Sequence, residues 1–97
     1  MWWGEAPDGK GRPYLVVSRD AANAVMARVL VAPITTRMRG APSELEVGPG
    51  EGLPVVSVAS FDNLRPLPKS LLVRRLGALG SARRHELCAV AAATLDC

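Results

Sequence analysis

The fold is decided by one stretch, Arg12–Arg37, which reads RPYLVVSRDAANAVMARVLVAPITTR. It contains two apolar runs, Tyr14–Val17 and Val29–Ile34, separated by the more polar connection Ser18–Arg28. Both runs are rich in Val, Leu and Ile, which favours buried β-strands. Asp and Asn within the connection are turn formers. The stretch therefore predicts an antiparallel pair of strands.

Polar residues flank this predicted pair at one end. Arg12 precedes the first run, and Thr35 and Thr36 follow the second. In an antiparallel pair, the start of the first strand lies beside the end of the second. A guanidinium supplies a forked set of hydrogen-bond donors, and a hydroxyl adds a neutral donor. The pattern predicts a phosphate-binding site at this end of the sheet.

Length and composition set the limits of the whole chain. Its 97 residues predict a single domain over 1–97, and a hydrophobic fraction of 48% excludes a disordered chain. No apolar run reaches the ~18 residues of a membrane span, and the first ten residues do not have the pattern of a signal peptide. We therefore expect a cytoplasmic protein without a membrane partner. The net charge of +3 is weak evidence by itself, because an Arg-rich composition is also typical of a GC-rich genome.

The rest of the chain predicts more short strands and one helix. Further strands are predicted at Met1–Glu5, Ser43–Val47, Pro54–Ser60 and Arg74–Leu79, with a polar-rimmed segment at Phe61–Pro66 and a helical turn at Pro68–Leu71. Leu45 and Val47 alternate with two glutamates, which is typical of a half-exposed strand. The strand at Pro54–Ser60 alternates in the same way.

A helix is predicted from Ser81 to the end of the chain. Ser81 is the expected N-cap, and apolar residues recur at helical spacing from Leu87 to Leu95. Arg83, Arg84 and Glu86 are expected to face outward. The predicted fold class is mainly β with a C-terminal helix (α+β), a small SH3-like barrel of five to seven short strands. Because its core would be thin, we expect such a chain to complete its burial as a homodimer.

No metal or cofactor site is predicted. The two cysteines, Cys88 and Cys97, are expected to be reduced thiols, because disulfides are rare in the cytosol. His85 and Glu86 lie close to Cys88, but no further ligand follows at a spacing typical of zinc sites.

Three blocks of this sequence resemble the MazF/PemK toxins, the endoribonucleases of bacterial type II toxin–antitoxin pairs. The first is GRPYLVVSRDAAN at Gly11–Asn23, and the second is VLVAPITTRMRG at Val29–Gly40. The third is SVASFDNLRPLPKSLL at Ser57–Leu72. The blocks occur in the order and spacing of the family, and with the helix they cover nearly the whole chain. Two departures affect the N-terminus: the family's first strand is clipped, and the loop Glu5–Gly11 is short.

The resemblance implies a CcdB-like barrel, a homodimer and metal-independent cleavage of single-stranded RNA. Carried over residue by residue, it implies that Arg12 and Thr35 are catalytic. It implies RNA contacts by residues after the second strand and in the third block: Thr36, Arg37, Arg39, Ser57, Asp62, Asn63 and, as part of the basic groove, Arg65. Trp2 and Trp3 are adjacent in a predicted strand, so their side chains are expected to point to opposite faces. One is expected in the core and the other at an interface, with stacking on RNA as the less favoured possibility.

RNA carries its own nucleophile, the 2′-hydroxyl. Its attack on the adjacent phosphorus expels the 5′-oxygen, leaving a 2′,3′-cyclic phosphate and a 5′-hydroxyl. Many such nucleases use two histidines, whereas this chain has one, His85, which lies on the predicted helix. We therefore expect Arg12 to stabilise the charge of the transition state, because a guanidinium with a pKa above ~12 rarely transfers a proton. A role for Arg12 in proton transfer stays open.

The predicted inhibitor of such a toxin is a cognate antitoxin with an acidic, disordered segment that folds along the basic groove. Two alternative functions remain at this point. A CcdB-like toxin of the same fold binds DNA gyrase and cleaves nothing, and a degenerate family member would also lack activity. The pair Arg12 and Thr35 favours the nuclease.

Overall fold

The computed structural model describes residues 1–5, 11–17 and 27–95. These residues form seven strands and a C-terminal α-helix, with four single-turn 3-10 helices between them. The strands are β1 (Trp2–Glu5), β2 (Gly11–Val16), β3 (Arg28–Thr35), β4 (Glu44–Val47), β5 (Ser57–Ser60), β6 (Arg65–Pro68) and β7 (Leu72–Arg75). The 3-10 helices are Pro49–Glu51, Phe61–Asn63, Lys69–Leu71 and Ser81–Arg83, and the α-helix is α2 (Arg84–Leu95). None of the described helices has the length and hydropathy needed to cross a membrane.

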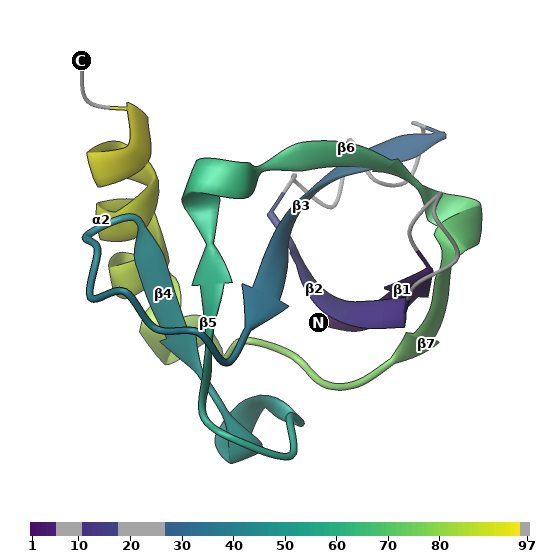
Figure 1. The fold of residues 1–97 in the computed structure, drawn as a ribbon, viewed down its shortest axis with the longest axis horizontal. Coiled ribbons are helices and arrows are strands. Elements are labelled where there is room, and N and C mark those ends of the chain that lie inside the picture. Colours follow the sequence, from purple (N-terminus) through teal and green to yellow (C-terminus); the bar gives the residue numbers. More distant parts are fainter. Residues whose placement is uncertain (6–10, 18–26, 96–97) are drawn as a thin grey trace.

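The sheet is antiparallel throughout and is centred on β3. Its strand order is β4-β5-β3-β2-β1-β7, with β6 paired to β3 outside this path. The first half of β3 pairs with β6, and its last two residues pair with β5. Figure 1 shows the sheet curled into a ring by this sharing, with α2 standing beside β4 and β5. The prediction of a small, strongly bent barrel with one terminal helix is confirmed.

Two hydrophobic clusters fill the two faces of the central strands. On β2, Leu15 belongs to the cluster beneath α2, whereas Tyr14 belongs to a smaller cluster with Leu67 of β6. Side chains alternate in the same way on β3, where Ile34 joins the first cluster and Val31 the second. Because both faces of these strands are covered, they read as continuous apolar runs in the sequence.

The segment before β5 differs from its prediction. An alternating, half-exposed strand was expected over Pro54–Ser60, but β5 contains only Ser57–Ser60, and all four residues are buried. The reason is that β5 lies between β3 and β4 in the sheet, and Val58 and Ala59 are covered on both of its faces. Val55 and Val56 precede the strand and are exposed.

Strand β7 was predicted at the wrong residues, and β6 was not predicted at all. The sequence predicted a strand over Arg74–Leu79, whereas β7 is Leu72–Arg75. It indicated a polar-rimmed segment at Phe61–Pro66 and predicted no strand at Arg65–Pro68. β6 pairs only with β3, so its outer edge needs no backbone donors and tolerates proline. The helical turn expected between them is confirmed at Lys69–Leu71.

The helix is confirmed, but its start is not. Gly80 is the N-cap of the turn Ser81–Arg83, and no side chain caps it, so the prediction of Ser81 as N-cap is wrong. Leu87, Val90 and Ala91 pack against the larger hydrophobic cluster, as the spacing predicted. The connection predicted at Ser18–Arg28 lies mostly outside the described residues, as do the turn at 6–9 and Cys97.

One charged residue near the helix start was predicted to face outward and does not. Arg83 is partly buried and forms ion pairs with Glu51 at 2.7 Å and with Glu86 at 2.8 Å. Glu51 also accepts a hydrogen bond from the backbone N–H of Gly48 at 3.3 Å. Arg83 therefore joins the start of α2 to the 3-10 turn after β4. The sequence could not indicate this, because Arg83 and Glu51 are 32 residues apart.

Candidate active site

The register of β2 against β3 brings two predicted site residues together. Tyr14 pairs with Pro33, Leu15 with Ala32 and Val16 with Val31. Continued by two residues, this register places Arg12 directly opposite Thr35. Residues opposite each other in an antiparallel pair point to the same face of the sheet. The continued register thus places Arg12 and Thr35 at the same end of the barrel, on neighbouring strands.

A cleft of about 420 Å³ opens at this end of the barrel. Its polar lining comes from Thr35 and Thr36 of β3 and its extension, Ser57 of β5 and Arg74 of β7. Its apolar lining comes from β1, β2, β3, the segment after the 3-10 turn Pro49–Glu51 and the residue after β7: Trp3, Pro13, Ile34, Leu53, Pro54, Val55 and Leu76. Five strands of the sheet thus contribute to one site.

Arg12 borders this cleft without lining it. Its side chain is half-buried, and its Nε atom is buried with no hydrogen-bond partner among the described residues. A buried donor left unpaired costs about 1–3 kcal/mol. An unpaired guanidinium donor prefers an anionic oxygen as its acceptor.

Hydrogen bonds hold the hydroxyls of the cleft in place. The Oγ1 of Thr35 accepts a hydrogen bond from the backbone N–H of Arg37 at 3.2 Å. The Oγ of Ser57 donates to the carbonyl oxygen of Val55 at 3.1 Å. Since Thr35 uses only its acceptor in this contact, its O–H remains able to donate to a ligand.

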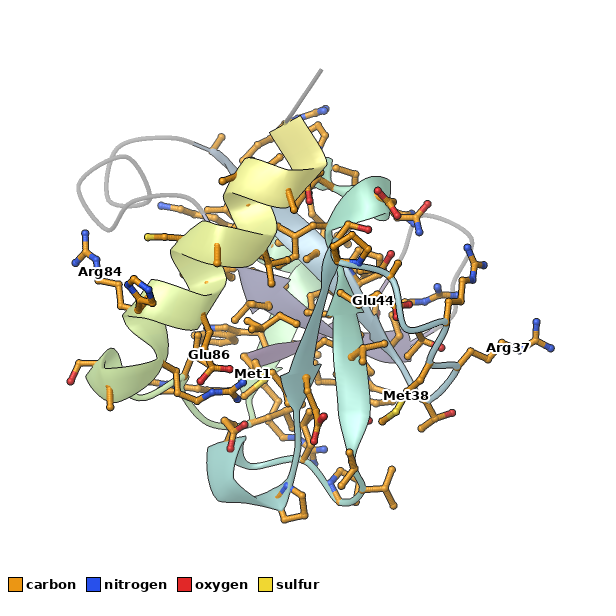
Figure 2. The ribbon with its side chains drawn as sticks, turned by 90° about the vertical axis from the view of Figure 1, so that its left-hand side faces the viewer. Met1, Arg37, Met38, Glu44, Arg84 and Glu86 are labelled. Carbon is orange, nitrogen blue, oxygen red and sulfur yellow. The ribbon has the colours of Figure 1, made fainter. Side chains whose placement is uncertain are left out.

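The loop after β3 is held by a carboxylate from β4. Glu44 accepts hydrogen bonds from the backbone N–H of Arg39, at 3.0 and 3.3 Å, and from that of Ala41 at 3.2 Å. Arg37, Met38 and Arg39 are exposed, and none of them lines the cleft. Figure 2 shows Arg37 extending from this loop into solvent, away from the body of the protein. The loop therefore presents two cations beside the cleft rather than within it.

Three other predicted site residues lie away from the cleft. Asp62 accepts a hydrogen bond from Ser43 at 2.6 Å, and Asn63 donates to Ser60 at 2.9 Å. Both therefore hold the turn between β5 and β6. Arg65 begins β6, and like Asp62 and Asn63 it is exposed and lines no part of the cleft. The third sequence block thus reaches the cleft through Ser57 alone.

Trp3 and Arg74 are among the residues of the cleft that were not predicted as site residues. Trp3 of β1 pairs with Arg74 of β7, and both line the cleft. Neither tryptophan is fully buried, so the expectation that one of them would be a core residue is wrong. β1 and β7 are the first and last strands in the sequence, and no local sequence pattern indicates their pairing.

Backbone hydrogen bonds of the first residue hold the segment that follows β7. The amino group of Met1 donates to the carbonyl oxygen of Gly77 at 2.6 Å, and the carbonyl oxygen of Met1 accepts from the backbone N–H of Leu76 at 2.9 Å. Leu76 is thereby held against the cleft. Among the described residues, no group of three or more His, Cys, Asp and Glu side chains could hold a metal ion.

The family model for the PemK-like, MazF-like toxins of type II toxin–antitoxin systems matches residues 4–95. The chain belongs to this family. The probable endoribonuclease MazF5 of Mycobacterium tuberculosis is 38% identical over 98 residues, covering all of this chain and 90% of the relative. The probable endoribonuclease MazF2 of the same species is 37% identical and also spans all of this chain and 95% of the relative.

Solved structures of MazF toxins share the fold. The Mycobacterium tuberculosis toxin MazF-mt6 superposes with a TM-score of 0.88 at 32% identity, covering 99% of this chain and 97% of the toxin. A mycobacterial endoribonuclease in complex with its cognate antitoxin has a TM-score of 0.84 at 28% identity, covering 97% of this chain and 88% of that one. The MazF-like match includes every residue that lines the cleft except Trp3, which is the residue just before it.

Proposed function

We propose that this protein is the toxin of a type II toxin–antitoxin pair and an endoribonuclease that cleaves single-stranded RNA. The observation that carries the proposal is the position of Arg12 opposite Thr35 beside the cleft, in a chain that belongs to the MazF-like family. The same match favours this function over CcdB-like inhibition of gyrase. The site of action is the cytoplasm, where RNA is available.

The two residues have complementary roles at the scissile phosphate. Arg12 stabilises the negative charge that develops on the phosphate oxygens when the 2′-hydroxyl attacks. Thr35 donates a hydrogen bond to the same phosphate and orients it. The products are a 2′,3′-cyclic phosphate and a 5′-hydroxyl. Because RNA supplies the nucleophile and these residues supply the donors, the reaction needs no metal ion.

The RNA strand enters the cleft from the loop after β3. Thr36 and Ser57 contact the strand within the cleft, and Arg37 and Arg39 attract its phosphates outside it. Contacts to phosphates on an exposed loop are sensitive to salt, so binding weakens as the ionic strength rises. We assign no contact in the cleft to the residues of the third block beyond Ser57.

Cleavage of mixed RNA in EDTA tests this function. The wild-type protein should produce fragments with 2′,3′-cyclic phosphate ends, and Arg12→Ala should lose about 100-fold or more in rate, as enzymes do on losing an oxyanion donor. Arg84→Ala is the matched control, because Arg84 is exposed at the start of α2 and points away from the body of the protein in Figure 2. Equal rates for Arg12→Ala and wild type would refute the site, and a requirement for added metal would refute the mechanism.

The active form is a homodimer. Met38 and Val55 lie three residues beyond the pair Thr35–Val58, on chains that leave the sheet at the same end. These two side chains and that of Val56 are about half-exposed, which is unusual for large apolar residues that lie together. Val56→Asp should shift the protein from dimer to monomer in sedimentation experiments, whereas Val73→Asp on β7 should not. A monomeric wild type at micromolar concentration would refute the dimer.

The partner that silences the toxin is an antitoxin with an acidic, disordered segment. Its carboxylates occupy the donors that RNA phosphates use, so the two ligands compete. In a titration with an uncleavable RNA, Arg37→Glu should weaken both ligands together, and Arg84→Glu should change neither. Simultaneous binding of antitoxin and RNA without loss of affinity would show that inhibition does not occur through the cleft.

A further inference from the structure

Three side chains from three strands form a row along one wall of the cleft. Trp3 on β1 pairs with Pro13 on β2 and with Arg74 on β7, and all three line the cleft. Because directly opposed residues share a face of the sheet, these three residues lie on one face, with Trp3 on the middle strand of the three. Two rigid rings and a planar cation therefore follow one another across this wall.

The backbone around Trp3 holds the indole in this position. A Cβ atom at Gly11 would lie 2.6–2.8 Å from three atoms of the indole, so the ring packs directly on the backbone of β2. The register of β1 against β7 shifts between Trp3 and Gly4, which pair with Arg74 and Leu72. Bulges of this kind redirect side chains and are frequent beside active sites. The Trp3 ring is thus supported from behind and half-exposed in front.

The chemistry of the cleft fits a nucleobase better than a phosphate. Leu53, Pro54 and Val55 also line the cleft and offer apolar surface and no charge. A phosphate gains nothing from such a surface, whereas the faces of a base are apolar and its edge bonds to hydroxyls such as that of Ser57. The volume of about 420 Å³ is at the small end of ligand pockets, as expected for one nucleotide unit rather than a longer segment.

We propose that Trp3 is a stacking platform that holds one nucleobase of single-stranded RNA in the cleft, beside the phosphate at Arg12 and Thr35. Arg74 lies at the end of the platform and contacts the edge of the same base. This inference rests on the proposed ribonuclease function and adds a base-binding subsite to it. Stacking on an aromatic side chain tolerates all four bases, so the platform sets the position of the strand rather than its sequence.

The test combines protein variants with missing bases. The probe is a labelled RNA 12-mer made uncleavable by a 2′-O-methyl group at its mapped cut position, together with versions that lack one base at a time. For the wild type, one abasic position next to the cut should weaken binding by about 5- to 150-fold. Trp3→Ala should weaken the intact RNA by a similar factor. In Trp3→Ala, the same abasic position should then cost nothing more, because both changes remove one contact.

Matched controls separate stacking from a structural role. Trp2→Phe alters the neighbouring tryptophan, which does not line the cleft, and should leave affinity unchanged. Because the chain has two tryptophans, this variant also leaves Trp3 as the only one, and its fluorescence should be quenched on binding. Gly11→Ala should displace the indole and reproduce the loss seen for Trp3→Ala. Trp3→Phe keeps a ring and should retain most of the affinity.

The outcomes distinguish the subsite from the function on which it rests. Additive losses for Trp3→Ala and every abasic position, or unchanged Trp3 fluorescence in the bound Trp2→Phe protein, would overturn the platform while leaving the ribonuclease intact. A wild-type protein that neither binds nor cuts RNA would overturn the proposed function and the platform with it. Should Trp3→Ala fail to fold, the abasic series on Trp3→Phe and Gly11→Ala gives the same comparison.

Discussion

The wall of the cleft depends on two glycines whose backbones touch. A Cβ atom built on Gly52 would overlap the carbonyl oxygen of Leu76, and one built on Gly77 would overlap that of Glu51. Gly52 also has a φ of +96°, which side chains rarely adopt. The residues that follow Gly52 and precede Gly77 line the cleft. We predict that Gly52→Ala is the most damaging of the glycine substitutions at these turns.

Four glycines allow the cost of a left-handed φ to be separated from the cost of atomic overlap. Gly50 has open space around it and an ordinary φ, and Gly40 has open space and a φ of +70°. Gly77 has the overlap without the positive φ, and Gly52 has both. A left-handed φ costs about 1–2 kcal/mol, and forcing atoms into packed structure costs about 1–3 kcal/mol.

The expected order of stability follows from these terms. Gly50→Ala should be neutral or stabilising by up to about 1 kcal/mol. Gly40→Ala should lose about 1–2 kcal/mol, Gly77→Ala about 1–3 kcal/mol, and Gly52→Ala the sum, about 2–5 kcal/mol. For a domain of this size, about 3 kcal/mol corresponds to a fall in Tm of roughly 12–24 °C.

Thermal unfolding followed by circular dichroism measures this order directly. Cleavage rates should be compared well below the lowest Tm, so that changes in the cleft wall are separated from loss of folded protein. The reasoning is refuted if Gly52→Ala melts within ~2 °C of Gly50→Ala, a gap that corresponds to less than about 0.5 kcal/mol. It is also refuted if Gly40→Ala is the least stable variant, since the overlap would then contribute nothing.

Three further predictions concern single side chains and the amino terminus. Tyr14→Phe should leave the free energy of unfolding in urea unchanged or raise it by up to about 1 kcal/mol, because the buried hydroxyl has no partner among the described residues; a loss above ~2 kcal/mol would contradict this. Glu44→Ala should release the loop that carries Arg37, raising the Kd for uncleavable RNA several-fold with little change in kcat, and Glu44→Gln should recover part of the affinity. Equal Kd values for the wild type and both variants would exclude the carboxylate as a positioning group. Burial and the neighbouring cation Arg75 lower the pKa of the Met1 amino group below 8.0, so its contribution to stability is present above that pH and is lost as the pH falls through the pKa of the folded protein. Urea titrations should show a higher free energy of unfolding at high pH, and this pH dependence should be smaller in Arg75→Gln.

The sequence by itself determined the central strand pair and the residues at its end. Two apolar runs separated by a polar connection predict an antiparallel pair, in which the start of the first strand lies beside the end of the second. This arrangement places Arg12 and Thr35 at the same end of the pair without any knowledge of the other strands. The apolar face of the helix was also readable, since Leu87, Val90 and Ala91 are local neighbours at helical spacing.

The tertiary structure alone decided what surrounds this pair. Trp3 meets Arg74 only because the sheet curls until its first strand pairs with its last, and no local pattern reports a contact between residues so far apart. The partial burial of Arg83 likewise requires Glu51 to approach from another turn. β6 became a strand despite two prolines because one of its edges needs no donors. Local propensity indicates the backbone conformation and the buried face of each element, whereas a cleft lined by five strands depends on how those faces are brought together.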